Sequence, residues 1–519
     1  MNRDIVIGLD AGTSVIKSVA FDRRGAQLAV VARPNQVTRG AGGAAEQDMA
    51  RTWDDAAATL RDLAQEIPDL AQRVLALAVT GQGDGTWLID AAGTPVAPGW
   101  LWLDSRAADI VSQLEAACVR DKLYRITGCG LNACNQSAQL LWLKRHRPEV
   151  LAKAATAFHC KDWLYFNLTG ARGTDVSEGI YTFGDFRKRA YAPEILELLG
   201  LTEQRDLLPE VIDGTRRSDP LSRGAAERIG LPAGLPVCLG YLDVICTALG
   251  GGLYAPGRAV GCSIVGSTGM HMRLSESVED VELGDSPSGY TMPFPVPGCL
   301  TQMQSNMAAT LNIDWIVDVA CEAAGALGPA VTRKEALPRI DAGVLAARPG
   351  SALYHPYIDE SGERGPFIDT NARAQFVGLS QKVGFFDLTR SVYEGLALAA
   401  LDCYSAMGHR PEEIRVAGGA ARSDALKTIL ASALGVPVRR SAREEAGAAG
   451  AAMIALVGIG AYDDMGAACA DWVEPLLGDT VAPDPALTDL YQRLYPIYVD
   501  LHRQMPDAWS RLAAAREAL

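Results

Sequence analysis

A turn near the start of the chain has residue types that can bind a phosphate group and its metal ion. Asp10 ends an apolar, strand-like run, and Gly12, Thr13 and Ser14 follow before a second such run begins. Carboxylate oxygens are ligands that Mg²⁺ prefers, and the backbone N–H groups of a tight turn bind anions. The same pattern is typical of an ordinary β-hairpin, in which the Asp10 carboxylate bonds only to neighbouring backbone. Lys17 comes next, and it either reaches a phosphate or lies in solvent.

The turn pattern occurs again in the second half of the chain. A constant offset of 254 residues relates the two turns, so that Gly12, Thr13 and Ser14 are matched by Gly266, Ser267 and Thr268. An internal repeat determines the architecture of a whole chain. We therefore expect a duplicated fold in which two phosphate turns close on one nucleotide. The second turn has no acidic residue, which favours a single metal ion beside the first half.

Asp243 has the position that a catalytic base needs. It lies between a short apolar strand and a helix-like segment, just before the middle of the chain. A carboxylate there can remove the proton from an acceptor hydroxyl during phosphoryl transfer. It can equally cap the free N–H groups of the helix that follows. The residue types alone leave both interpretations open.

A further group of polar residues in the first half can bind a small polyhydroxy compound. Trp102, Asp104 and Arg106 combine an aromatic plate with an acid and a base. Carboxylates accept bonds from O–H groups, and an indole ring covers C–H faces. Gln82 and Asp84 follow a strand-like run at a glycine-rich end and belong to the same predicted pocket. The alternative is internal, with Asp104 paired to Arg106 at a helix start and Trp102 in the core.

Strand-like and helix-like segments alternate along the chain, which is typical of an α/β protein. The expected strands are residues 5–9, 15–21, 74–80, 237–240, 259–265, 270–274 and a short run that ends before Gly418. The expected helices are residues 53–65, 107–117, 138–144, 244–249, about 307–324, a segment that starts near Ser423, and 445–452. The last of these has glycine and alanine on several faces, so it packs closely against either a helix or a flat ligand.

The length of the chain predicts two domains. A single core stops growing at roughly 250 to 300 residues, and the chain has 519. A glycine-rich segment with a proline, residues 250–258, is the expected boundary. We therefore expect domains at residues 1–253 and 254–519.

Composition excludes several classes of partner. Hydrophobic residues make up 48% and charged residues 21%, as in ordinary globular proteins. A net charge of −14 argues against nucleic-acid and anionic-membrane partners, which need clustered Lys and Arg. The chain start lacks a signal-peptide pattern, and the eleven cysteines form no CxxC pair, so we expect a cytoplasmic protein with reduced core thiols. The spacing of the histidines is not that of metal ligands. The sequence leaves the oligomeric state open, and a homodimer is one of the alternatives.

Several ordered motifs resemble the FGGY family of carbohydrate kinases over essentially the whole length. P-loop and G-x-G-x-x-G motifs are absent from the expected places, which disfavours P-loop kinases and Rossmann dehydrogenases. The matching motifs are the turn at Asp10, Trp102-x-Asp104-x-Arg106, Gly240-x-x-Asp243, Gly266-Ser267-Thr268, Gly418-Gly419-Ala420-Ala421-x-Ser423 and a signature over residues 374–394.

This resemblance implies two actin-like, ribonuclease-H-like domains around a central nucleotide and substrate cleft. The first domain would bind the sugar or polyol and carry Asp243 as general base, and the second would bind most of the ATP. Mg²⁺ would lie on Asp10, with Asp243 as a second possible ligand. The expected substrate-binding residues are Gln82, Asp84, Trp102, Asp104, Arg106 and Asp243. The expected ATP-binding residues are Gly12, Thr13, Ser14, Lys17, Gly266, Ser267, Thr268, Gly418, Gly419, Ala420 and Ser423.

The segment from Gln82 to Gly85 bears on the acceptor. In the family, xylulose kinases usually have Gln-Met-His-Gly here, and glycerol kinases have arginine and glutamate after the glutamine. Asp84 therefore matches the acid that binds polyol hydroxyls in glycerol kinases, while Gly83 lacks the bulk of the arginine. Cys134 similarly replaces a tyrosine. A roomier pocket that keeps its carboxylate indicates a polyol slightly longer than glycerol.

Within the family, the chain resembles members that act on erythritol, and this resemblance implies phosphorylation of erythritol at a terminal hydroxyl. A pentulose kinase acting on xylulose or ribulose is the main alternative. A non-catalytic, actin-like protein that binds nucleotide is an alternative of another class, but it has no need of the polar set around Asp84 and Asp243.

Overall fold

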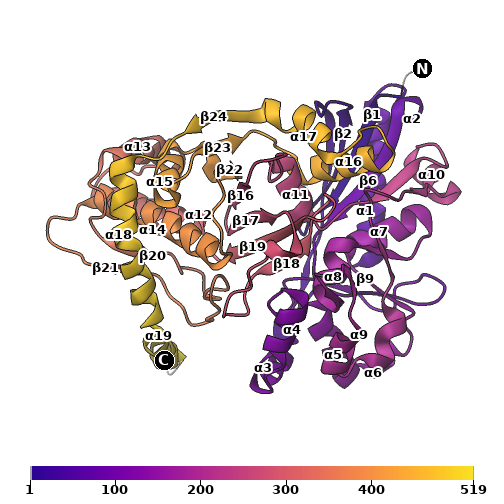
Figure 1. The fold of residues 1–519 in the computed structure, drawn as a ribbon, viewed down its shortest axis with the longest axis horizontal. Helices are drawn as coiled ribbons and strands as arrows, with labels where there is room; N and C mark the ends of the chain where they lie inside the picture. Colours follow the sequence, from indigo (N-terminus) through magenta and orange to yellow (C-terminus); the bar gives the residue numbers. More distant parts are fainter. Residues whose placement is uncertain (1–2, 518–519) are drawn as a thin grey trace.

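The computed structural model describes residues 3–517 and contains two large β-sheets, one from each half of the chain (Figure 1). The first sheet has six strands in the order β14 (Asp219–Pro220), β15 (Pro236–Leu239), β6 (Val74–Gly81), β1 (Ile5–Ala11), β2 (Val15–Asp22) and β3 (Gln27–Pro34). The second has seven strands in the order β18 (Tyr290–Pro293), β19 (Leu300–Asn306), β17 (Gly269–Ser275), β16 (Val260–Val265), β22 (Glu413–Ala417), β23 (Val438–Ser441) and β24 (Leu477–Val481).

The two sheets repeat one topology. In the first sheet β1 is antiparallel to β2 and parallel to β6, which is parallel to β15. In the second sheet β16 is antiparallel to β17 and parallel to β22, which is parallel to β23. The turns after β1 and after β16 therefore occupy equivalent places, and the duplication predicted from the offset of the two turns is confirmed.

Helices cover both sheets. Those of the first half are α1 (Met49–Glu66), α2 (Leu70–Arg73), α3 (Ala108–Ala116), α4 (Val119–Thr127), α5 (Gln136–His146), α6 (Pro148–Leu151), α7 (Cys160–Thr169), α8 (Val176–Phe183), α9 (Pro193–Leu199), α10 (Arg223–Ile229) and α11 (Asp243–Gly251). Those of the second half are α12 (Thr310–Leu327), α13 (Arg333–Ala346), α14 (Phe385–Ala406), α15 (Asp424–Leu434), α16 (Ala446–Gly458), α17 (Met465–Trp472), α18 (Pro485–Arg503) and α19 (Pro506–Glu517). Every helix and strand expected from the sequence is present, with ends shifted by a few residues.

Short strands pair outside the two large sheets. The pairs and the triplet are β4 (Thr38–Arg39) with β5 (Ala45–Gln47) and β8 (Gly99–Trp100), β7 (Trp87–Ile89) with β9 (Thr156–Phe158), β10 (Gly173–Asp175) with β13 (Glu210–Ile212), β11 (Gly184–Asp185) with β12 (Ala190–Tyr191), and β20 (Leu353–His355) with β21 (Gln375–Val377). Most of them lie in the first half, where they hold the loops beside the candidate site.

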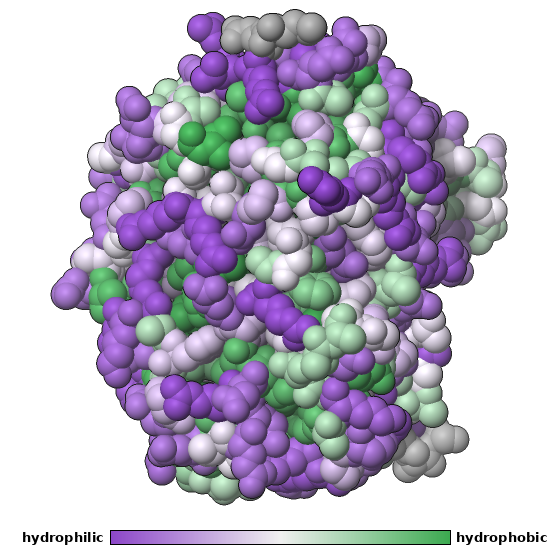
Figure 2. Space-filling view, turned by 90° about the vertical axis from the view of Figure 1, so that its right-hand side faces the viewer, coloured by the Kyte–Doolittle hydropathy of each residue, from purple (hydrophilic) through white to green (hydrophobic). Residues whose placement is uncertain are grey.

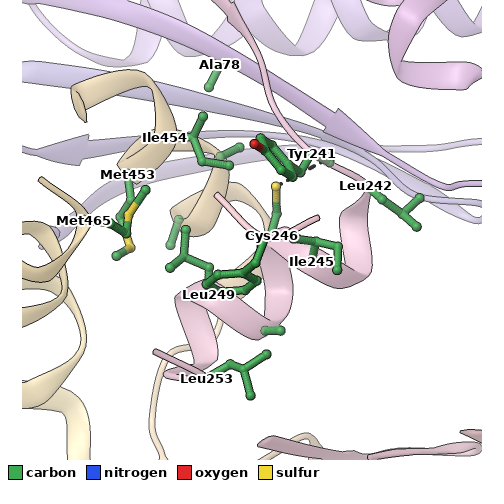
Figure 3. Packing of buried hydrophobic residues seen from close by; sticks show 14 of the residues in the cluster. Ala78, Tyr241, Leu242, Ile245, Cys246, Leu249, Leu253, Met453, Ile454 and Met465 are labelled. Atoms are coloured by element: carbon green, nitrogen blue, oxygen red, sulfur yellow. Dashed lines mark hydrogen bonds between the residues drawn. The ribbon is translucent and has the colours of Figure 1, made fainter. Parts of the chain in front are cut away.

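Helices α11 and α16 join the two halves. They lie side by side, and Cys246 of α11 is on the side where Met453 and Ile454 of α16 lie (Figure 3). A β-carbon at Gly450 of α16 would be 2.0 Å from the carbonyl oxygen of Cys246. Of the two alternatives for the small-residue helix, the structure shows close packing against a helix. The same helix also packs on the first sheet, because a β-carbon at Gly8 of β1 would be 2.3 Å from the carbonyl oxygen of Ala448.

The surface and the cysteines agree with the composition. All eleven cysteines are free thiols and most are buried, as expected. The face formed by the first half is mostly hydrophilic, broken by small hydrophobic areas (Figure 2). Within residues 3–517 there is no helix of the length and hydropathy that a membrane crossing requires.

Candidate active site

Asp10 and Asp243 form the centre of the candidate site. Asp10 is the penultimate residue of β1, and Asp243 is the first residue of α11. Burial raises the pKa of Asp243 to about 8, and the negative charge of Asp10 adds to this shift. Burial also raises the pKa of Asp10 to about 6, against the opposing effect of the Lys17 ammonium. The Asp10 carboxylate is therefore close enough for its charge to act on Asp243, and the pKa of both carboxyl groups is raised.

The helix-capping interpretation of Asp243 is only partly met. Its Oδ1 accepts a hydrogen bond from the N–H of the next residue, Val244, at 2.6 Å. Its Oδ2 has no donor among residues 3–517. One carboxylate oxygen thus fixes the side chain at the start of α11, and the other is free to accept a proton.

The two aspartates fit a divalent cation that keeps most of its other ligands from elsewhere. No group of three or more metal-ligating side chains occurs within the part of the chain that the structure describes. Mg²⁺ in nucleotide sites takes one or two protein carboxylates and completes its shell with water and phosphate oxygens. Two carboxylates whose mutual repulsion raises the pKa of Asp243 provide such a place, because a cation would remove that repulsion.

In both phosphate turns, carbonyl oxygens accept hydrogen bonds from neighbouring segments of the protein. Asn35 donates to the carbonyl oxygens of Gly12 and Ser14 at 3.0 and 2.8 Å. In the equivalent turn, the carbonyl oxygens of Gly266 and Ser267 accept the N–H groups of Thr310 and Ala309 at 2.9 and 2.7 Å. With these acceptors occupied, the backbone function left to bind a phosphate is the N–H groups that have no partner within the turn, which excludes the Gly266 N–H because it donates to the Thr268 carbonyl oxygen at 3.0 Å.

The third predicted nucleotide segment follows β22. Gly418 has φ of 91°, and a β-carbon there would lie 2.6 Å from the carbonyl oxygen of Val265, so this close approach to β16 requires glycine. Gly419 and Ala420 are exposed or half-buried in the turn that follows. Ser423 caps α15 by accepting the N–H of Leu426 at 3.0 Å, and its hydroxyl donates to Asp341. Its side chain is therefore bound within the protein.

Lys17 is paired across the two halves. Its ammonium group lies 2.8 Å from Oε2 of Glu445, the residue just before α16. In the ladder of β1 and β2, Lys17 is opposite Asp10. The structure therefore places Lys17 beside the candidate metal ligand, bound to Glu445 rather than extended toward a turn.

Asp84, a predicted acceptor-binding residue, is fixed by several neighbouring side chains. Its side chain accepts hydrogen bonds from Asn135 at 2.7 Å, from Tyr181, and from the thiol of Cys134 at 3.6 Å. Its backbone has φ of 55°, in the left-handed region, and Glu178 accepts its N–H at 2.6 Å. Such a conformation is uncommon outside glycine and persists where the surroundings determine it. Asn135, Tyr181 and Glu178 were not predicted from the sequence.

A buried ionic cluster supports this conformation. Lys161 of α7 lies 2.5 Å from Glu178, 2.8 Å from Asp175 and 3.1 Å from Asp162, and all four side chains are fully buried. Ser177, next to Glu178 in α8, accepts the N–H of Leu242 at 3.0 Å. One helix therefore supports both Asp84 and the loop that leads to Asp243. In the sequence, this cluster is visible only as charged residues within apolar segments. Such a pattern does not show which of these residues pair with one another.

Gln82 connects the acceptor side to the first phosphate turn. Its Oε1 accepts the Thr13 hydroxyl at 2.7 Å, and its amide donates to Gln47 at 2.7 Å. Trp102, which is 37% exposed, donates its indole N–H to the same Thr13 hydroxyl at 2.8 Å. The structure thus brings Gln82, Trp102 and Thr13 together, and Trp102 is not a core residue.

Asp104 and Arg106 form the internal pair that was the alternative interpretation. The buried Asp104 carboxylate accepts Arg106 Nη2 at 2.6 Å and the N–H of Ala45 at 2.9 Å. Arg106 also bonds Glu46 at 2.7 Å, and its guanidinium lies 3.4 Å from the ring centroid of Trp100. The structure therefore favours the internal pair, because the oxygens of Asp104 accept hydrogen bonds within the protein, and contact of Asp104 with the substrate stays a prediction.

The space at Gly83 also differs from expectation. A β-carbon there would lie 2.0 Å from Cδ1 of Leu242 and 2.9 Å from Oε1 of Glu178. The volume that an arginine would take is therefore filled, and Gly83 does not by itself enlarge the pocket. A cavity of about 900 Å³ lies elsewhere, lined by Val176, Arg189 and Phe294 among others, and none of the predicted site residues lines it.

Comparisons with known proteins agree with the two-sheet arrangement. Residues 5–250 match the N-terminal domain, and residues 261–459 the C-terminal domain, of the FGGY family of carbohydrate kinases. The chain is 51% identical to erythritol kinase of Brucella abortus (strain 2308), over 99% of this chain and 98% of the relative. It is 27% identical to L-xylulose/3-keto-L-gulonate kinase of Escherichia coli (strain K12), over 95% of this chain and 96% of the relative.

A solved structure has the same fold. The xylulose kinase of Rhodospirillum rubrum superposes with a TM-score of 0.87 at 28% identity, covering 98% of this chain and 100% of that one. These kinases use ATP and phosphorylate a sugar or a sugar alcohol. Because the matches cover both halves and the duplicated sheets carry the motifs in the family's order, the chain belongs to the FGGY family of carbohydrate kinases and is a phosphotransferase with an alcohol group as acceptor.

Proposed function

We propose that this kinase transfers the γ-phosphoryl group of ATP to a terminal hydroxyl of erythritol. The 51% identity to an erythritol kinase over nearly the whole of both chains carries the proposal. The acceptor side supports it, because Asp84 presents a carboxylate fixed by three side chains, and such a group accepts O–H donors of a polyol.

In the proposed reaction Asp243 is the general base. Its Oδ2 accepts the proton of the attacking hydroxyl, while the bond from Oδ1 to Val244 keeps the carboxylate in place. Because burial and the charge of Asp10 raise the pKa of Asp243 to about 8, the carboxylate form that accepts the proton grows as the pH rises through this value, and a cation bound beside it would favour that form at lower pH. The acceptor oxygen then attacks the γ-phosphorus, and the bond from phosphorus to the bridging oxygen of ADP breaks.

The nucleotide is placed by both halves. We propose that the turns Gly12–Ser14 and Gly266–Thr268 bind phosphate oxygens through the N–H groups that have no partner within the turn, and that the turn at Gly418–Ala420 lies beside the nucleoside. Asp10, with Asp243 nearby, would hold Mg²⁺, which when bound neutralises charge on the transferring phosphate. We further propose the division into a polyol-binding domain, 1–253, and a mainly ATP-binding domain, 254–519.

A panel of acceptors tests the function. ADP release with MgATP is measured for glycerol, erythritol, ribitol, xylitol, D-xylulose, L-xylulose and L-ribulose. We expect erythritol to saturate with the highest kcat/KM. If a pentulose saturates while erythritol gives no more ADP than water does, the substrate proposal is wrong. If no acceptor raises ADP release, the chain would instead be a nucleotide-dependent binding protein.

Asp243→Asn tests the proposed base. We expect kcat to fall by roughly 10² to 10⁴, the usual effect of losing a general base, with ATP affinity nearly unchanged. Asp206→Asn, at an exposed aspartate of the first half, is the matched control and should retain full activity. Near-normal turnover of the Asp243 variant would refute its role.

A further inference from the structure

Arg364 lies in the segment between β20 and β21 of the second half, outside every motif singled out in the sequence. We propose that Arg364 is an acceptor-binding residue supplied by the nucleotide half, and that it donates to hydroxyl groups at the end of the polyol remote from Asp243. This inference rests on the kinase function proposed above and adds a residue that determines acceptor length.

The side chain of Arg364 is held but not neutralised. Its Nε donates to the Ser305 hydroxyl at 3.0 Å, and its backbone N–H donates to the buried Glu363 carboxylate at 2.9 Å. Among residues 3–517, Arg364 makes no ion pair, and its two terminal nitrogens have no hydrogen-bond acceptor. A half-buried guanidinium therefore keeps four N–H donors available for a ligand.

The strand register places this guanidinium near the acceptor pocket. Tyr290 of β18 is directly opposite Met303 of β19, and Ser305 lies two residues further on the same face. The Tyr290 ring contacts Tyr181 edge-on, with ring centroids 5.9 Å apart. Tyr181 in turn donates to Asp84. A chain of contacts thus runs from the anchor of Arg364 to the proposed acceptor carboxylate.

Charge effects agree with this geometry. Burial and then Asp84 raise the pKa of the Cys134 thiol, and Arg364 opposes that shift. The pKa of the Tyr290 phenol responds to the same two charges in the same way. Asp84 and Arg364 therefore flank common side chains without bonding to each other. The Asp84 carboxylate accepts hydrogen bonds and the Arg364 guanidinium donates them. Neighbouring hydroxyl groups of a polyol both donate and accept, so they match this pair.

Arg364 also shares its support with the second phosphate turn. Glu363 accepts the N–H of Met307 at 2.9 Å. Three residues further, Thr310 donates to Gly266 of the turn, at 2.9 Å. Residues 307–310 therefore contact both the segment that carries Arg364 and the second phosphate turn. In this way the nucleotide half brings a phosphate site and an acceptor contact to the cleft together.

Replacement of Arg364 by Met tests the proposal. We expect the KM of erythritol to rise about 10- to 100-fold, the effect of losing a hydrogen bond to a charged group, while the KM of ATP stays within about twofold. Ser305→Ala, which leaves the guanidinium but removes its anchor, should raise the acceptor KM in the same direction by a smaller factor. Arg373→Met is the matched control, because that guanidinium donates to the backbone carbonyls of Thr370 and Ala372.

Acceptor length gives the discriminating readout. Glycerol lacks the fourth carbon and its hydroxyl, so Arg364→Met should lower kcat/KM for erythritol more than for glycerol, by about tenfold. Equal losses for both acceptors, or an equal rise in the KM of ATP, would overturn the proposal. If wild-type enzyme uses a pentulose instead, the function proposal fails, and the variant is measured with that sugar. An acceptor KM within twofold of wild type would then refute the role of Arg364.

Discussion

Asp243 and Asp10 have pKa values that predict a pH-dependent rate. A general base acts only when deprotonated, and the pKa of Asp243 is raised to about 8 by burial and then by Asp10. The kcat/KM for the acceptor at low MgATP should therefore rise with pH, reach half its maximum near pH 8 and level off above that pH, because this constant reports the free enzyme. At saturating MgATP the positive metal ion should lower the apparent pKa. A profile that is flat from about pH 6 to 9 at low MgATP would contradict the assignment.

Asp84 should affect the acceptor and not the nucleotide. Its carboxylate is fixed by Asn135 and Tyr181 in the first half, and no predicted ATP-binding residue bonds to it. Asp84→Ala should raise the acceptor KM by about 10- to 100-fold and leave the KM of ATP nearly unchanged. Asp90→Ala, at a turn aspartate that accepts the N–H of Thr94, is the control. Equal effects on both KM values would place Asp84 elsewhere in the mechanism.

Local sequence indicates some of these residues and cannot indicate others. Asp10, Asp84 and Asp243 could be predicted as site residues because each stands at or shortly after the end of a strand, or at the start of a helix, a position that the neighbouring residues mark. Glu178 and Arg364 are missed because their roles depend on segments that are distant in the sequence and meet only in the fold. For Asp104 the sequence left two interpretations open, because a carboxylate near a tryptophan has the same pattern whether it faces a ligand or an arginine, and the structure favours the arginine.

At the scale of elements, α16 is the helix whose composition is explained most directly by its packing. Its glycines admit the backbone of α11, and Gly447 admits the Asp10 side chain, since a β-carbon there would lie 2.4 Å from Oδ2 of Asp10. Close packing of this helix could be predicted from its glycine and alanine residues alone, without knowing which element it packs against. The strands of two or three residues, such as β4 and β11, were not predicted because a hydrophobic period needs more residues than they contain.

Gly450→Ala should destabilise the protein even though alanine is the better helix former. The added carbon would collide with the backbone oxygen of Cys246, and overpacking of this kind costs typically about 1–3 kcal/mol. Gly325→Ala in α12 is the control. Its new carbon would have only Ala330 nearby, at 3.9 Å, so it should stabilise the fold by about 0.5–1 kcal/mol. Denaturant unfolding measures both changes, and a stabilised Gly450 variant would contradict the packing argument.

At the scale of the whole molecule, one hydrophobic cluster belongs to both halves. It includes Val6 and Ala76 of the first sheet and Cys262 and Met272 of the second, with α11 and α16 between them. Helix α16 follows the proposed boundary at 253 in the sequence but covers β1 of the first sheet (Figure 1). The boundary proposed from the sequence therefore does not separate two independent hydrophobic cores, because this cluster contains residues from both sides of it.

This shared cluster predicts that the two halves unfold together. Separating them would expose the apolar faces of α11 and α16, at a cost of about 25 cal/mol for each Å² of apolar surface. Calorimetry should show one transition, with tryptophan fluorescence and circular dichroism changing at the same temperature. MgADP, proposed to bind mainly the second half, should then raise the midpoint for both probes equally, since a ligand of the native state stabilises the whole cooperative unit. Two transitions, of which MgADP shifts only one, would show that the halves unfold independently and that α16 does not unite them.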